Sequence, residues 1–159
     1  MMKKINWKVL ITSLILVYGI AFVGSIFTTQ NVNSAWYETT KTSITPPSFI
    51  FPIVWNILFF LIALSIYFAW TSKKAQKGSA KKSIAILFGL NLFFNALWSF
   101  IFFGLQNPKG AFVELIVLWL SIISLLFLTY RVEKKSFYLL IPYFLWVSFA
   151  GILNGLIAF

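Results

Sequence analysis

The stretch Thr45–Asn56, which reads TPPSFIFPIVWN, marks the point where a long polar connection ends and a second apolar run begins. Pro46 and Pro47 suit the first turn of a helix, where a missing N–H group costs nothing, and the threonine before them can cap that turn. Phe51 and Trp55 lie four residues apart and therefore share one helical face. The stretch favours either the rim of a pocket or a capped membrane helix with ordinary interfacial aromatic residues.

The composition of the rest of the chain is that of an integral membrane protein. Of its 159 residues, 60% are hydrophobic and only 10% are charged, whereas soluble domains have about 45–50% apolar and about 25% charged residues. The mean hydropathy is +0.91. Each apolar run is close to the ~20 residues that a helix needs to cross a bilayer. We therefore predict an all-α fold with one membrane domain of five transmembrane helices, over residues 9–27, 49–70, 83–104, 111–130 and 137–159.

The residue types that are absent exclude several kinds of chemistry. The sequence has no histidine and no cysteine, and its only acidic residues are Glu38, Glu114 and Glu133. A protein-built metal site, axial ligation of haem by histidine or cysteine, and a serine nucleophile with a histidine base are therefore not expected. The net charge of +10 does not indicate nucleic acid, because the lysines lie between apolar runs. We expect no required cofactor and no nucleic-acid partner.

Basic residues are distributed unequally between the two ends of the predicted bundle. One end carries eleven of them and the other only Lys41 and Lys109. The positive-inside rule then places the N-terminus in the cytoplasm and the C-terminus outside. The expected location is a bacterial cytoplasmic membrane. The eleven residues are Lys3, Lys4, Lys8, Lys73, Lys74, Lys77, Lys81, Lys82, Arg131, Lys134 and Lys135.

Three predicted helices bring tryptophan and asparagine into the outer half of the membrane. The first connection, residues 28–48, lies on the same side and carries Trp36 and Tyr37, so it is placed as a lid. Asparagine in hydrocarbon is costly unless it is hydrogen-bonded. These residues can line a pocket, or asparagines can pair across helices while tryptophans fill gaps. At a rise of about 1.5 Å per helical residue, the residues concerned lie roughly 6–18 Å below the outer surface. They are Trp55, Asn95, Trp98, Trp146, Ala150 and Asn154.

The order and spacing of short motifs then point to a known family. The motifs are Trp36-Tyr37; Pro46-Pro47 with Phe51-Pro52 and Val54-Trp55; Asn95-Ala96-Leu97-Trp98-Ser99 with Phe102-Phe103; and Pro142-Tyr143 with Trp146, Phe149-Ala150 and Leu153-Asn154. In these motifs the chain resembles the TspO/MBR family, which comprises the tryptophan-rich sensory proteins of bacteria and the mitochondrial translocator protein, or peripheral benzodiazepine receptor.

The resemblance implies a five-helix bundle with a ligand pocket under the first connection. It implies that the pocket binds porphyrins, such as protoporphyrin or haem, and synthetic isoquinoline-carboxamide and benzodiazepine ligands. It also implies light-dependent porphyrin breakdown, in which Trp55 and Trp146 would be the catalytic residues. By the same resemblance, the pocket would include Tyr37, Pro47, Trp55, Asn95, Trp146 and Ala150.

We therefore expect a membrane receptor or sensor in which aromatic rings stack on a porphyrin. Asn95 and Tyr37 would bond its polar edges, and Lys41 would meet a propionate. The first alternative is an enzyme that degrades protoporphyrin in light. The second is a tetrapyrrole or sterol transporter, which is disfavoured because no buried charge and no inverted repeat is apparent. Membrane lipid is an expected partner in every case.

Small residues predict close contacts between helices. Gly151 and Gly155 form a GxxxG pair, and Ala85 with Gly89 forms a second small pair. Ala21 and Ser25 form a third pair in the first span. The first two pairs favour either a homodimer or tight packing inside one monomer, and the third favours close packing of the first span.

Overall fold

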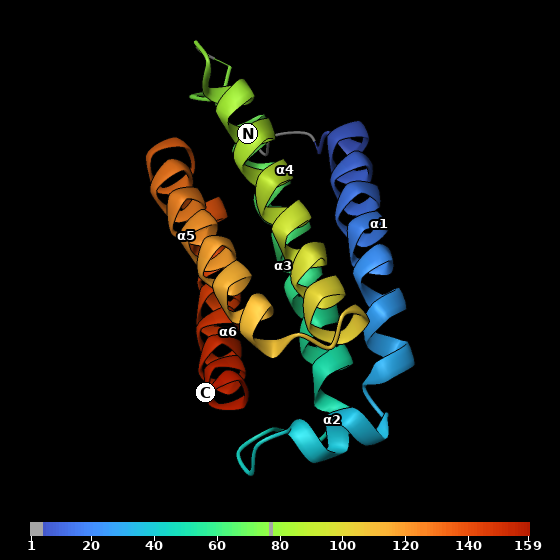
Figure 1. Cartoon of the computed structure of the whole chain (residues 1–159). Coiled ribbons are helices and arrows are strands. Elements are labelled where there is room, and N and C mark those ends of the chain that lie inside the picture. Colours follow the sequence, from blue (N-terminus) through green and yellow to red (C-terminus); the bar gives the residue numbers. More distant parts are fainter. Residues whose placement is uncertain (1–4, 77) are drawn as a thin grey trace.

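Five long helices form a bundle in the computed structural model, which describes residues 5–76 and 78–159 (Figure 1). All regular secondary structure in these two ranges is helical, and five segments are long and apolar enough to cross a membrane. The predicted all-α class with five spans is therefore confirmed. The helices are α1 (Trp7–Asn31), α2 (Ala35–Thr40), α3 (Ile50–Thr71), α4 (Ala80–Ser99), α5 (Pro108–Val132) and α6 (Lys134–Ala158), and a π-helical turn, η1 (Phe100–Gly104), extends α4.

The core of the bundle lies between the five long helices, and α1 contributes the fully buried Val17. Fully buried aliphatic side chains, such as Ile62, Ile122 and Leu140, form one continuous cluster. Two serines join α3 to the start of α6 within this apolar core. The Ser65 and Ser136 hydroxyls lie 2.7 Å apart, and Ser136 Oγ also donates to the Ser65 carbonyl over 2.8 Å. Each polar group in the pair thus has a partner, as burial in hydrocarbon requires.

The first connection is more ordered than a polar loop. Helix α1 continues to Asn31, and α2 occupies Ala35–Thr40. Ser34 caps α2, because its side chain accepts a 3.2 Å hydrogen bond from the Tyr37 backbone N–H. The short helix lies across one end of the bundle, at the opposite end from the start of α1 (Figure 1).

The prediction that Thr45 caps a helix beginning at the two prolines is wrong. Helix α3 begins at Ile50, and the Thr45 hydroxyl lies 3.0 Å from the Thr42 hydroxyl within a turn. The Pro47 carbonyl accepts a 3.0 Å hydrogen bond from the Ile50 N–H, which closes a further turn before the helix. Pro52 lies in the first turn of α3. Backbone N–H groups in a first turn have no partner within the helix, so the N–H that proline lacks costs no hydrogen bond there.

The end of α4 widens into η1. The Leu105 N–H donates to the Phe100 carbonyl over 2.9 Å, a bond that spans five residues instead of four. Such π-turns often occur at functional sites. Gln106 follows with a φ of 49°, a left-handed conformation that turns the chain into α5. The widened turn buries Phe102 and Phe103 beneath α2.

The glycines show which small-residue pairs pack inside the monomer. A Cβ atom on Gly151 would lie 3.1 Å from a Leu115 methyl carbon, and one on Gly155 would lie 3.2 Å from the Phe112 ring. The GxxxG face of α6 is therefore already packed against α5. Gly89, in contrast, has open space at the same position.

Candidate functional site

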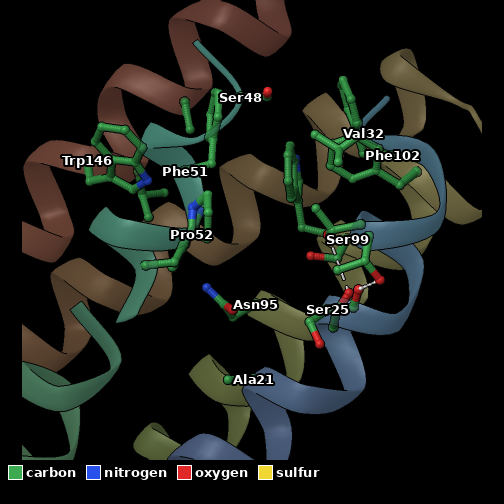
Figure 2. A pocket seen from close by; sticks show the side chains of 18 of the residues that line it. Ala21, Ser25, Val32, Ser48, Phe51, Pro52, Asn95, Ser99, Phe102 and Trp146 are labelled. Atoms are coloured by element: carbon green, nitrogen blue, oxygen red, sulfur yellow. Dashed lines mark hydrogen bonds between the residues drawn. The ribbon is translucent and has the colours of Figure 1, made fainter. Parts of the chain in front are cut away.

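A cavity of about 660 Å³ lies in the half of the bundle next to α2. Its volume falls within the range of about 300–1,000 Å³ that small-molecule sites occupy. All five long helices contribute to its wall, and Figure 2 shows Asn95 of α4 projecting between residues of α1 and α3. Eight residues that the sequence singled out for ligand binding line this cavity: Tyr37, Phe51, Trp55, Asn95, Trp98, Trp146, Ala150 and Asn154.

Two other singled-out residues, Trp36 and Pro47, do not line the cavity. Trp36 packs edge-on against Phe102, a residue of the cavity lining, with ring centroids 5.7 Å apart. Pro47 is exposed in the turn before α3. Lys41, which was expected to meet a propionate, lies outside the cavity wall and forms a 2.6 Å ion pair with Glu38.

Two aromatic pairs line the cavity, and we call them the aromatic wall. Trp55 stacks on Phe59, with centroids 5.2 Å apart and planes 27° from parallel. Phe51 meets Trp146 edge to face at 6.0 Å, which joins α3 to α6 across the wall (Figure 2). Rings in these geometries attract one another beyond their buried area. The wall is therefore an apolar surface of two ring pairs, with planes 27° from parallel in one pair and 67° in the other.

The indole N–H groups of three core tryptophans differ in their partners. Trp98 Nε1 donates to Asn154 Oδ1 over 3.0 Å, and Trp119 Nε1 donates to Ser148 Oγ over 2.8 Å. Trp146 Nε1 is buried and has no hydrogen-bond partner among the described residues. A buried donor without a partner carries a desolvation cost of about 1–3 kcal/mol. Trp146 lines the cavity with its ring, and protein atoms cover this nitrogen.

A polar chain crosses the bundle below the cavity. Asn95 Nδ2 donates to the Tyr143 hydroxyl over 3.2 Å, and that hydroxyl donates to Asn91 Oδ1 over 3.3 Å. Asn91 Nδ2 then donates to Ser121 Oγ over 2.8 Å. Asn91 therefore joins helices. Asn95 is bonded through its amide nitrogen only, and the described residues supply no donor for its amide oxygen. The sequence named Tyr143 only as part of a motif and missed its central place in this chain.

Tyr37 closes the end of the cavity from α2. Its side chain is buried, 6% exposed, and packs on Phe103 and Phe102 with centroids 5.4 and 6.4 Å away. Burial raises the pKa of the Tyr37 hydroxyl above its usual value, and the neighbouring Glu38 carboxylate raises it further. The hydroxyl therefore remains a proton donor at neutral pH.

Helix α1 contributes more to the cavity than the sequence indicated. Ala21 and Ser25, expected to pack against another helix, line the cavity instead, and the close helix contact is made by Gly24 against Ser99 of α4. Phe22 of α1 and Phe49, just before α3, also line the cavity although they are 68% and 64% exposed. The cavity therefore opens between α1 and α3, on a face that meets lipid in a membrane.

One ionisable side chain is buried within the spans, which was not expected. Glu114 lies in α5 and is only 8% exposed, and neither of its carboxylate oxygens has a hydrogen-bond partner among the described residues. Its neighbour Leu115 lines the cavity. Ionisable residues inside membrane spans are rare and are often functional. Among the described residues, no group of three histidine, cysteine or acidic side chains could hold a metal ion.

Comparison with known proteins places these features in a family. Residues 12–159 match the family model described as the TspO/MBR family. The chain is 37% identical to the tryptophan-rich protein TspO of Archaeoglobus fulgidus, over 91% of this chain and 92% of the relative. It is also 37% identical to the protein of the same name from Chlorobaculum tepidum, over 86% and 85%. The translocator protein of Homo sapiens is 31% identical, over 84% and 78%.

Proposed function

Because this integral membrane protein belongs to the TspO/MBR family, we propose that it is a receptor or sensor that binds porphyrins, such as protoporphyrin or haem, in the cavity under α2. Ligands of the benzodiazepine-receptor type would occupy the same aromatic wall. The eight lining residues singled out by the sequence are the proposed contacts, with Trp55 and Trp146 as the main stacking surfaces. Asn95 would bond a polar edge of the ligand.

The observation that carries this proposal is that two tryptophans from different helices, Trp55 of α3 and Trp146 of α6, line the same cavity. Indole rings at these two positions can stack on a flat aromatic ligand. A porphyrin has both a flat aromatic face for Trp55 and polar carboxylates at its edge. An apolar lipid chain would fill the cavity but has no flat aromatic face for the tryptophans and no polar group for Asn95.

Alanine variants of the purified protein test the proposal by quenching of tryptophan fluorescence with protoporphyrin. Trp55→Ala and Trp146→Ala should each weaken binding by about 1–3 kcal/mol, the scale of a lost large aromatic contact. Trp119→Ala is the matched control, because Trp119 does not line the cavity. Unchanged affinity in both cavity variants, with the fold intact, would rule out this site.

A second candidate is light-dependent protoporphyrin breakdown, with Trp55 and Trp146 as the catalytic residues. Their shared position on one cavity wall favours it, because both indoles would contact the same bound ring system. The discriminating experiment is illumination of the purified protein with protoporphyrin. A new product that requires both light and Trp146 would indicate the enzyme, and binding without turnover would indicate the receptor.

Transport of a tetrapyrrole or sterol is the third candidate. Glu114 supplies the buried acid whose absence had counted against it. For all three candidates we propose a bacterial cytoplasmic membrane with the N-terminus inside, because the end of the bundle opposite the cavity is rich in lysine. The cavity would then open towards the outer leaflet.

A further inference from the structure

A second hollow, of about 400 Å³, lies at the end of the bundle opposite α2. We call it the lysine-end crevice. Its walls come from the start of α1, the end of α3 and the start of α4, and include Asn6, Tyr67, Trp70 and Lys81. Two hydrogen bonds fix the walls. The Asn6 N–H donates to the Tyr67 hydroxyl over 3.3 Å, and Gln76 Nε2 donates to the Trp70 carbonyl over 3.0 Å.

Lys81 is the single charged residue among those that line this crevice. Its ammonium lies 5.5 Å from the centre of the Trp70 ring, in a cation–π contact that holds it at the wall. The one ion pair within the described residues, Lys41 with Glu38, lies at the opposite end of the bundle. The Lys81 charge therefore lacks a described carboxylate partner.

The surroundings of the crevice are also basic. Lys73 and Lys74 lie in the connection that contributes Gln76 to the lining, and Lys82 follows Lys81 in the first turn of α4. Lys74 is already engaged, because its ammonium donates to the Arg131 carbonyl over 2.8 Å. A site with a fixed ammonium, neighbouring hydroxyl and amide groups and no acidic wall residue among those described attracts an anion.

From this arrangement we propose that the lysine-end crevice binds the phosphate group of an anionic ligand, with Lys81 as the principal contact. The crevice lies at the ends of the membrane-spanning helices, at the level where lipid phosphates are found. An anionic phospholipid headgroup and a small free phosphate ester carry the same recognised group. The site is separate from the aromatic cavity, so it binds independently of a porphyrin.

Two lysines in the same turn of α4 provide a matched test. Lys81→Gln removes the crevice ammonium, whereas Lys82→Gln removes the same charge from an exposed neighbour outside the lining. The full chain is placed in nanodiscs of dioleoyl phosphatidylcholine with or without one fifth dioleoyl phosphatidylglycerol. Lipids that stay bound are counted by native mass spectrometry, and acetylation of each lysine is measured by peptide mapping.

The wild-type protein should retain phosphatidylglycerol in preference to phosphatidylcholine, and Lys81 should be protected from acetylation more than Lys82. Lys81→Gln should lower this retention about fivefold, the effect of one charge near a membrane surface, while Lys82→Gln changes it much less. A second arm adds glycerol 3-phosphate to phosphatidylcholine nanodiscs. Protection of Lys81 in that arm alone would identify a free phosphate ester as the ligand.

Equal effects of the two substitutions would overturn the proposal, because they would show a diffuse surface attraction. Lack of Lys81 protection in both arms would overturn it as well.

Discussion

Trp98 Nε1 donates a 3.0 Å hydrogen bond to Asn154 Oδ1, and this bond ties α4 to α6 beside the cavity. The same asparagine donates from Nδ2 to the Pro108 carbonyl over 2.8 Å, at the start of α5. One fully buried side chain thus joins three helices. Asn154 lines the cavity, but both ends of its amide are already engaged.

Asn154→Ala should therefore destabilise the protein more than it changes ligand affinity. It breaks both bonds and leaves the Trp98 donor without a partner, which costs about 1–3 kcal/mol. Thermal unfolding in detergent measures the loss. The control is Asn56→Ala, whose exposed amide bonds only the Pro52 carbonyl of its own helix and should have an effect within about 0.5 kcal/mol. Equal stability of the two variants would contradict the role of Asn154 as a three-helix link.

Glu114→Gln should raise the thermal midpoint by about 2–4 °C, the shift that corresponds to about 1 kcal/mol in a chain of this size. The reason is that Gln keeps the shape of the side chain and removes a carboxylate for which the described residues supply no partner. Glu38→Gln, at an exposed and paired carboxylate, is the control. A marked fall in the midpoint of Glu114→Gln would show that a bound partner holds this carboxylate.

The lid should become protected when a ligand binds. Tyr37 contacts both η1 and the cavity, so an aromatic guest should hold α2 in place. Trypsin cleavage after Lys41 should then slow in the presence of protoporphyrin, whereas cleavage between Lys73 and Lys82 should not change. In oriented vesicles the two regions should be cut from opposite sides. Equal protection of both regions would contradict the lid, and cleavage of both from one side would contradict the proposed orientation.

The two small-residue faces should respond differently to a bulky side chain. Gly151→Leu should destabilise the monomer, because its Cβ would already lie 3.1 Å from Leu115. Gly89→Leu should leave the monomer stable, since Gly89 has open space. If the exposed Ala85 and Gly89 face forms a homodimer, Gly89→Leu should also lower the mass of the detergent-solubilised complex. A wild-type protein that is monomeric at every concentration would rule out the dimer.

The bundle could be predicted because membrane spans depend on local hydropathy, which the sequence displays directly. The cavity could be predicted in large part because Trp55, Asn95 and Trp146 lie at similar depths on helices that must pack together. The orientation of Trp36 could not be predicted, since it depends on α2 and on the widened η1 turn. The contribution of α1 was missed because Ala21 and Ser25 indicate close packing as readily as a cavity wall. Glu114 is isolated because its described neighbours supply no hydrogen-bond partner for its carboxylate. No local sequence pattern shows which groups will surround a side chain.

The indole N–H signals of the tryptophans provide the most direct measurement of ligand binding in the cavity. In protein labelled with ¹⁵N-tryptophan, the Trp146 signal is assigned by its absence in Trp146→Phe, and the Trp119 signal by its absence in Trp119→Phe. Titration with metal-free protoporphyrin should move the Trp146 signal, because the bound aromatic ring system contacts this indole at the cavity wall. It should leave the signal of Trp119, bonded to Ser148 outside the cavity, in place. A Trp146 signal that does not move at saturating protoporphyrin would contradict the proposed site.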